Sequence, residues 1–180
     1  MLEKLFDRSM DHFQTARIRA ERLRPDHLAE LRAMHRDRRV MATLGGLRSD
    51  AATRNYLAAN LNHWERHGYG LWVLRDEVGR FLGRAGIRHL IIEGEPEIEL
   101  AYSFLTDHWG RGLATEIASA LLRMAWTHLG LSSLVSYTGV ANLASQRVLQ
   151  KVGFSFERAL DYEGESCLLY RIHCPARAPQ

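Results

Sequence analysis

The sequence predicts one α/β domain, with a mixed sheet and helices on both faces. Segments typical of strands and helices follow one another in the order β-α-α-β-β-β-α-β-α-β-β, without a repeat or a long linker. A chain of 180 residues, 46% of them hydrophobic, can form one sizeable core. We therefore expect a single domain over residues 1–174 and a loose tail over residues 175–180.

The first part of the chain is expected to form one strand and two helices. Residues 16–23 are assigned to the strand, and Pro25 lies in the first turn of a helix that runs to about residue 37. Residues 40–49 contain Gly45 and Gly46 and are expected to form a loop. Ser49 or Asp50 can cap the next helix, which continues to about residue 67.

The rest of the chain alternates strands and helices. Strands are expected over residues 70–75, 81–91 and 97–105, with turns at 77–79 and 93–96. Apolar residues recur on one face of a helix over residues 113–128. A strand over 134–138, a helix over 143–151 ended by Gly153, and a hairpin of 154–160 and 167–172 complete the domain.

A loop with two glycines joins the strand 97–105 to the helix 113–128. Residues 109–116 read Trp-Gly-Arg-Gly-Leu-Ala-Thr-Glu. The first turn of a helix has N–H groups without partners, and the helix dipole adds partial positive charge there. Gly110 and Gly112 let a phosphate approach the backbone, and Arg111 adds a permanent charge. The loop therefore predicts a pyrophosphate site.

Two common phosphate-binding patterns fit this loop poorly. A P-loop requires Gly-Lys-Ser/Thr after four intervening residues, and no segment has that pattern. A dinucleotide-binding loop requires a third small residue, where Thr115 stands, and an acidic residue about 20 positions later. The following strand, residues 132–137, contains no acidic residue.

A third pattern is similar to the GNAT superfamily of acetyl-CoA-dependent N-acetyltransferases. Gly112, Leu113 and Ala114 match the end of that family's Gln/Arg-x-x-Gly-x-Gly/Ala loop, with Trp109 at the Gln/Arg position. The whole segment resembles the branch that acetylates the N-terminal alanine or serine of ribosomal proteins. A second segment, Asn142 to Phe154, resembles the family's Asn-x-x-Ser…Leu-x-Lys-x-Gly-Phe pattern. The resemblance covers roughly residues 15–172.

The resemblance implies a GNAT-like, mostly antiparallel mixed sheet whose fourth and fifth strands splay apart. These strands would be residues 97–105 and 134–138, with the pantetheine arm of acetyl-CoA in the gap between them. The residues expected to hold the cofactor are Phe104, Leu105, Gly110, Arg111, Gly112, Leu113, Ala114, Thr115, Asn142 and Ser145. A backbone N–H at Phe104 or Leu105 would stabilise the oxyanion. The alternative role of Asn142 is to cap its own helix.

The resemblance also implies direct attack of a primary amine on the thioester, without an acyl-enzyme. Glu99 is the candidate general base, and the alternative is a salt bridge to an arginine such as Arg88. The family often carries a tyrosine as proton donor where this chain has Leu149. Ser145 is therefore the first candidate acid, and Tyr137 is the second.

A peptide or protein N-terminus is the favoured acceptor, and a small amine is the alternative. An α-amine has a pKa near 8, whereas a lysine near 10.4 needs a stronger base. The acceptor groove is expected between Gly45-Gly46 and the final hairpin, whose acidic turn could attract a cationic amine or be an ordinary solvated turn. His63 and His67 share a helical face but lack the His-Glu-x-x-His spacing, so we expect no metal site.

Composition limits the partners. The net charge of +3 is too small to indicate nucleic acid as the main partner, and no apolar run approaches the roughly 20 residues of a membrane span. Two cysteines do not form a disulfide framework, and we expect a cytoplasmic protein. A homodimer is compatible with the family. The rival functions are a non-catalytic acyl-CoA-binding module and a nucleotide- or nucleic-acid-binding protein.

Overall fold

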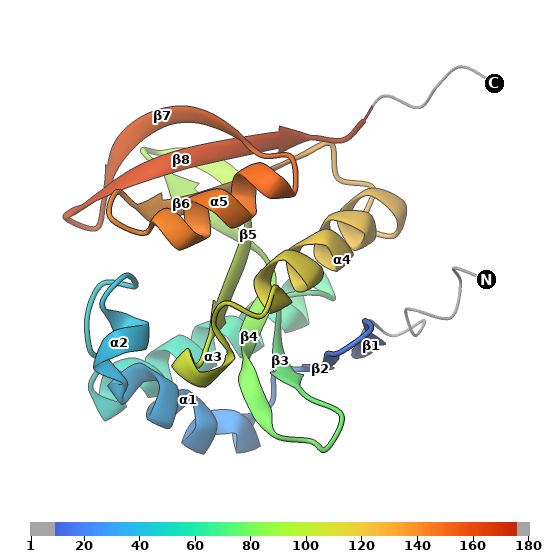
Figure 1. Ribbon diagram of the computed structural model, residues 1–180, viewed down its shortest axis with the longest axis vertical. Helices are drawn as coiled ribbons and strands as arrows, with labels where there is room; N and C mark the ends of the chain where they lie inside the picture. The colour runs from blue at the N-terminus through green and yellow to red at the C-terminus, as the bar shows by residue number, and fades with distance from the viewer. Residues whose placement is uncertain (1–9, 176–180) are drawn as a thin grey trace.

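The computed structural model contains an eight-stranded mixed sheet in the order β1-β2-β3-β4-β5-β6-β8-β7. It describes residues 10–175, so nearly all of the expected C-terminal tail lies outside the described residues. Figure 1 shows the sheet twisting from the N-terminal strands to the β7–β8 hairpin, with helices on either side of it. Between residues 10 and 175, no helix is both long and apolar enough to cross a bilayer.

The expected first strand over residues 16–23 is present but shorter, since β2 lies within this range, and a second short strand that was not expected precedes it. β1 (His12–Gln14) and β2 (Arg19–Arg22) form an antiparallel hairpin. The Thr15 N–H donates to the Ile18 carbonyl at 2.9 Å, and the Ile18 N–H donates to Thr15 Oγ1 at 3.2 Å. This tight turn separates β1 from β2, so that β2 begins only at Arg19.

Helices precede the central strands. A 3₁₀ turn (Pro25–His27) leads into α1 (Leu28–Arg36), and α3 (Asp50–His67) begins at the predicted cap Ser49, whose hydroxyl accepts from the Ala52 N–H. The expected loop over 40–49 begins instead with the last residues of a short helix, α2 (Arg38–Met41). The Asp37 carboxylate caps α2, and the buried Val40 and Met41 anchor it.

The central strands form an antiparallel meander of β3 (Leu71–Arg75), β4 (Phe81–Ile92) and β5 (Glu95–Phe104). The turn between β4 and β5 is only Glu93-Gly94, so Pro96 lies within β5 rather than in the expected turn. After β5 come α4 (Leu113–Thr127), β6 (Ser133–Gly139), α5 (Leu143–Lys151), β7 (Ser155–Tyr162) and β8 (Glu165–His173).

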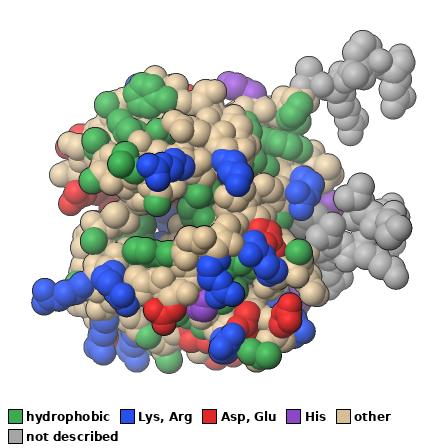
Figure 2. Space-filling view, viewed as in Figure 1, with side chains coloured by type: hydrophobic (Ala, Val, Ile, Leu, Met, Phe, Trp, Pro, Cys, Tyr) green, Lys and Arg blue, Asp and Glu red, His purple; other side chains and the backbone are tan. Residues whose placement is uncertain are grey.

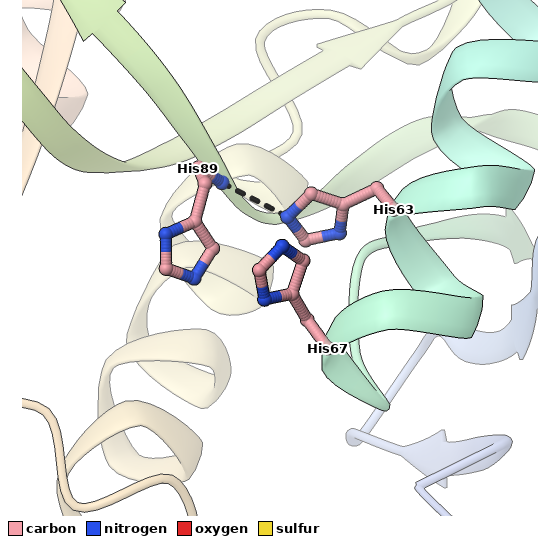
Figure 3. A group of neighbouring side chains, drawn as sticks. All are labelled: His63, His67 and His89. Carbon is pink, nitrogen blue, oxygen red and sulfur yellow. Dashed lines mark hydrogen bonds between the residues drawn. The ribbon is translucent and has the colours of Figure 1, made fainter.

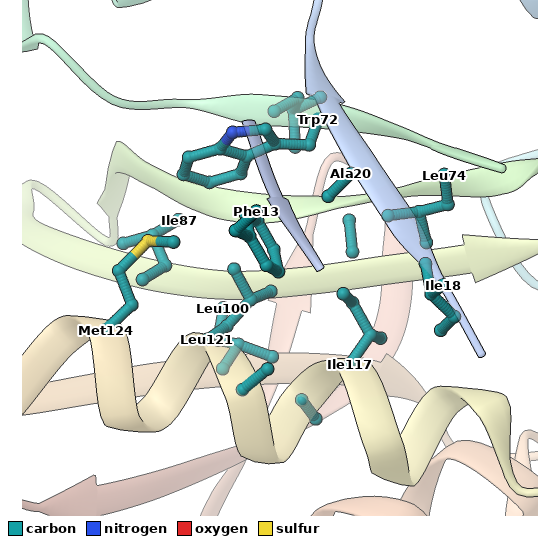
Figure 4. Packing of buried hydrophobic residues seen from close by; sticks show 14 of the residues in the cluster. Phe13, Ile18, Ala20, Trp72, Leu74, Ile87, Leu100, Ile117, Leu121 and Met124 are labelled. Carbon is teal, nitrogen blue, oxygen red and sulfur yellow. The ribbon is translucent and has the colours of Figure 1, made fainter. Parts of the chain in front are cut away.

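The core lies mainly between the sheet and α4. Ile117, Leu121 and Met124 of α4 pack towards Ile87 of β4 and Leu100 of β5 (Figure 4). Since side chains alternate along a strand, the neighbouring Arg88 and Glu99 lie on the opposite face. That face is covered by α3, where the Arg84 guanidinium lies over the Tyr56 ring. The helix α4 therefore covers one face of the sheet, and α1 and α3 cover the other.

The sheet opens between β5 and β6, the strands for which the resemblance implies a splay. They run parallel and are in register at one pair only, Glu99 with Val135. Every other neighbouring pair of strands is antiparallel and has at least three registered pairs. The C-terminal halves of β5 and β6 consequently diverge towards the N-termini of α4 and α5.

Candidate active site

The glycine loop lies at the N-terminus of α4, next to the gap between β5 and β6. Gly112 is the N-cap of α4 and has a φ of 75°, a conformation that favours glycine. The first backbone hydrogen bond of the helix joins the Glu116 N–H to the Gly112 carbonyl at 3.1 Å. The N–H groups of Leu113, Ala114 and Thr115 thus have no acceptor within the helix, as an anion site requires.

The turn between β1 and β2 fixes the orientation of this loop. The Glu116 carboxylate accepts hydrogen bonds from the Thr15 hydroxyl at 2.5 Å and from Arg17 Nε at 2.7 Å. Burial raises the pKa of Glu116, but these hydrogen bonds outweigh burial and lower it overall. Arg17 Nη1 also donates to the Arg111 carbonyl at 2.8 Å. The Arg111 side chain itself is exposed beside the loop.

At the end of β5, the backbone of Phe104 faces the gap. The Leu105 N–H donates to the Leu82 carbonyl of β4 at 2.9 Å, so it faces away from the gap. Because backbone groups alternate sides along a strand, the Phe104 N–H and carbonyl face β6. Trp109 Nε1 donates to that carbonyl at 2.8 Å. Of the two predicted oxyanion donors, only Phe104 is oriented towards the gap.

The opposite wall of the gap is the N-terminus of α5. Asn142 Oδ1 accepts from the Ser145 N–H at 3.1 Å, which is the helix cap that the sequence left as an alternative. Leu149, at the position of the family's tyrosine, is fully buried in the core. Ser145 is partly buried, and its side chain points across the gap towards β5.

A hydroxyl from β5 meets Ser145, and the sequence analysis missed it. Tyr102 Oη lies 3.1 Å from Ser145 Oγ and donates to the Ser145 carbonyl at 3.2 Å. Burial raises the pKa of Tyr102 to about 12, although the Ser145 hydrogen bond opposes this shift. A tyrosine hydroxyl thus reaches the gap from the strand, not from the helix.

Glu99 lies at the point where β5 and β6 separate, with only 4% of the residue exposed. Arg88 Nε donates to Glu99 Oε2 at 2.6 Å, which is the salt bridge considered as the alternative to catalysis. The Glu99 charge is the main cause that raises the pKa of Arg88. The pair neutralises a carboxylate that would otherwise be costly to bury.

Tyr137 lies beside Glu99, on the same face of the sheet. Burial and then the Glu99 charge raise the pKa of Tyr137. Its ring lies 4.5 Å from that of Tyr162 on β7. Ser145 and Tyr137, the two candidate acids, therefore lie on opposite sides of the splayed strands.

The turn of the final hairpin borders the Glu99 face. Asp161 Oδ1 accepts from the Gly164 N–H at 2.9 Å, so this carboxylate stabilises the turn. Glu163 acts electrostatically on Arg48, which precedes α3, and on Tyr137. Figure 2 shows the surface hollowed between the part of the molecule that holds the hairpin and the part that holds α2. The sequence analysis expected the acceptor groove in this region, and that expectation stays a prediction.

A group of three histidines lies elsewhere (Figure 3). His63 and His67 of α3 are joined by His89 of β4, and one ring nitrogen of each lies within 4.8 Å of the others. The sequence spacing does not reveal this third imidazole. His63 Nε2 accepts from the His89 N–H at 2.9 Å, and His63 Nδ1 lies 2.9 Å from the Tyr69 carbonyl. His63 thus accepts a backbone N–H of β4 at a position that β3 does not reach. The absence of a metal stays a prediction.

Comparisons with known proteins agree with this geometry. The family described as the acetyltransferase (GNAT) domain matches residues 17–155. The uncharacterized protein YkkB of Bacillus subtilis is 31% identical over 122 residues, which are 67% of this chain and 71% of YkkB. The uncharacterized N-acetyltransferase YoaA of the same organism is 29% identical over 53% of this chain and 54% of its own length.

Solved structures share the fold. The acetyltransferase from Agrobacterium tumefaciens has a TM-score of 0.78 and 28% identity, with 91% of this chain and 94% of that one covered. The enzyme from Salmonella typhimurium that modifies the N-terminal serine of ribosomal protein L7/L12 has a TM-score of 0.74 at 15% identity, covering 89% and 96%. The family match, the splayed sheet and the glycine loop lead to one assignment. This chain belongs to the GNAT family and is an N-acetyltransferase.

Proposed function

We propose that this protein transfers the acetyl group of acetyl-CoA to a primary amine by direct attack, with a peptide or protein N-terminus as the favoured acceptor. The observation that carries the proposal is the glycine loop, whose unpartnered N–H groups open beside the gap between β5 and β6. A pyrophosphate at the loop and a pantetheine arm in the gap would bring a thioester towards Glu99 and Ser145.

The residues present fit the cofactor. N–H groups of residues 110–115 and the Arg111 side chain would hold the pyrophosphate. The Phe104 N–H would donate either to a pantetheine amide or to the oxyanion. Acetyl-CoA supplies the acetyl thioester, and the protein supplies orientation and proton transfer.

Proton transfer is assigned to Glu99 and to Ser145. Glu99 would take a proton from the amine, through a bridging water, while Arg88 holds the carboxylate in place. Ser145 would deliver a proton to the leaving thiolate, and the Tyr102 hydroxyl at 3.1 Å would hold the Ser145 hydroxyl. Tyr137 is the second candidate donor.

The favoured acceptor follows from the weakness of such a base. A carboxylate paired with arginine suits an α-amine, a fair fraction of which is neutral near its pKa of 7.7–8.0. A lysine side chain near 10.4 would need about 4 kcal/mol more help. The Salmonella neighbour, which modifies an N-terminal serine, supports an N-terminal acceptor by analogy.

Two measurements test the proposal. Acetyl-CoA should raise the melting temperature of the protein, and its absence of effect would contradict the proposal. Release of CoA, followed with a thiol reagent, should then occur with N-terminal peptides and less with free lysine, spermidine or an aminoglycoside. Thermal protection without turnover on any of these amines would favour the non-catalytic acyl-CoA-binding module.

A further inference from the structure

Two arginines under α3 lack the anionic partner that buried arginines need. Arg84 on β4 is 6% exposed, and its Nε is buried without a hydrogen-bond partner. Arg48 has a buried Nη1 without a partner, and the adjacent Tyr56 hydroxyl is also buried and unpartnered. Among the described residues, neither arginine has a salt bridge. A buried charge without a partner costs free energy.

Other largely buried arginines of the same sheet are paired. Arg75 contacts Glu21 and Glu30, Arg88 contacts Glu99, and Arg171 contacts Glu97 and Glu157. Arg48 and Arg84 instead lie against an aromatic ring, with guanidinium carbons 4.7 and 5.1 Å from the Tyr56 ring centroid, and Glu163 acts on Arg48 without a salt bridge among the described residues. Such cation–π contacts offset only part of the desolvation of two cations. The positive charges add to one another, since burial and then Arg84 lower the pKa of Arg48.

The arginine pair lies on the acceptor side of the sheet. Arg84 is on the same face of β4 as Arg88, which holds Glu99, and faces Ser103 in the β4–β5 register. α4 and its glycine loop lie on the other face, so these arginines are not placed to bind the pyrophosphate. Glu163 of the final hairpin acts on Arg48 across the predicted acceptor groove.

We propose that Arg48 and Arg84 form a subsite for an anionic group on the acceptor, so that the preferred substrate carries both a primary amine and a carboxylate or phosphate. The proposal rests on the proposed acetyl transfer and adds a substrate class to it. Arg84 lies beside the end of β5, whereas Arg88 is four residues further along β4, about 13 Å at 3.3 Å per residue. This span suits an acidic residue near a peptide N-terminus better than the α-carboxylate of a free amino acid.

The test compares acceptors that differ only in charge. Peptides with Glu or phosphoserine at the second or third residue are compared with the same peptides carrying Gln. Free glutamate is tested beside them. We expect the acidic or phosphorylated peptide to exceed its Gln counterpart in kcat/KM by about tenfold or more, which is the size of a charge-assisted hydrogen bond. Arg84→Met and Arg48→Gln should each abolish most of that preference. The matched control, Arg66→Gln on the exposed face of α3, should keep it.

Stability and binding measurements keep the test independent of turnover. Since Arg84→Met removes an unpartnered buried charge, it should leave the melting temperature unchanged or raise it. Glutarate should raise the melting temperature of the wild-type chain and not that of Arg84→Met.

The outcomes separate the two proposals. Equal turnover of Glu and Gln peptides would overturn the anionic subsite while leaving the acetyltransferase function intact. If no amine is acetylated, the glutarate measurement decides, because its absence of effect overturns the subsite and its arginine-dependent shift supports it. A lower melting temperature for Arg84→Met with unchanged acid preference would make Arg84 a structural residue.

Discussion

Tyr102 and Ser145 form a pair of hydroxyl groups across the gap between β5 and α5. The oxygens lie 3.1 Å apart, and the pKa of Tyr102, at about 12, keeps the phenol protonated at neutral pH. The phenol can therefore hold the serine hydroxyl in one orientation. This arrangement makes Tyr102 a positioning residue for the proposed acid.

Tyr102→Phe should lower kcat by about tenfold and leave the KM for acetyl-CoA nearly unchanged, because one hydrogen bond of about 1–1.5 kcal/mol is lost. Steady-state kinetics of CoA release would measure both constants. Ser145→Ala should cost more, and adding Tyr102→Phe to it should cost little further. Additive losses would contradict the coupling of the two hydroxyls.

Glu99→Gln should abolish most turnover and also destabilise the fold. The substitution removes the negative charge that neutralises the largely buried Arg88, which typically costs about 3–5 kcal/mol. The double variant Glu99→Gln/Arg88→Met should regain stability in urea unfolding but remain inactive. Recovery of turnover in the double variant would reduce Glu99 to a salt-bridge partner.

At the scale of elements, neighbouring segments fix the first turn of α4 beside the gap between β5 and β6. Gly112 permits the left-handed N-cap, and Glu116 ties the turn to Thr15 and Arg17 of the first hairpin. The site thus depends on a contact between segments about 100 positions apart. A cap side chain at residue 112 would use the N–H groups that the proposed pyrophosphate needs.

Gly112→Val should remove the thermal protection given by acetyl-CoA. A β-branched residue at a φ of 75° is strained, and its side chain would occupy the space for the phosphates. Isothermal titration calorimetry would measure the loss as an affinity decrease of at least tenfold. Leu143→Ala, an exposed change in α5, is a control for general destabilisation. Normal binding by Gly112→Val would place the phosphates elsewhere.

The whole molecule should lose stability in mild acid. Burial lowers the pKa of His35 to about 3, with Arg48 and Arg84 adding to the shift, and burial lowers that of His63 to about 4. In the unfolded chain, the histidine pKa values are near 6.5. At pH values between the folded and the unfolded pKa, the unfolded chain therefore binds more protons than the folded chain. The free energy of unfolding therefore rises with pH, and stability is lost as pH falls below 6.5.

Urea unfolding between pH 6.5 and pH 5 would measure this slope. Each of the two histidines contributes up to about 1.4 kcal/mol per pH unit. His35→Gln should reduce the slope by up to about 1.4 kcal/mol per pH unit, whereas the exposed His12→Gln should not change it. An unchanged slope in His35→Gln would mean that His35 is not kept neutral by the fold.

Several features were predictable because neighbouring residues determine them. The helix from Leu113, the Ser49 cap and the loop around Gly110 and Gly112 depend on local backbone preference, and the structure agrees with each of these. The first hairpin and α2 were missed, because the Thr15 turn and the Asp37 cap are short signals within regions assigned on composition.

The sequence by itself determined the fold class, the family and the position of the glycine loop at the N-terminus of α4. Only the tertiary structure decided which groups meet. The register of β4 on β5 pairs Arg88 with Glu99, the splay brings Tyr102 to Ser145, and α3 covers Arg84 without supplying a carboxylate. A loop at a helix N-terminus is encoded by adjacent residues. A salt bridge or an unpaired charge instead depends on how distant segments pack, which local preferences do not specify.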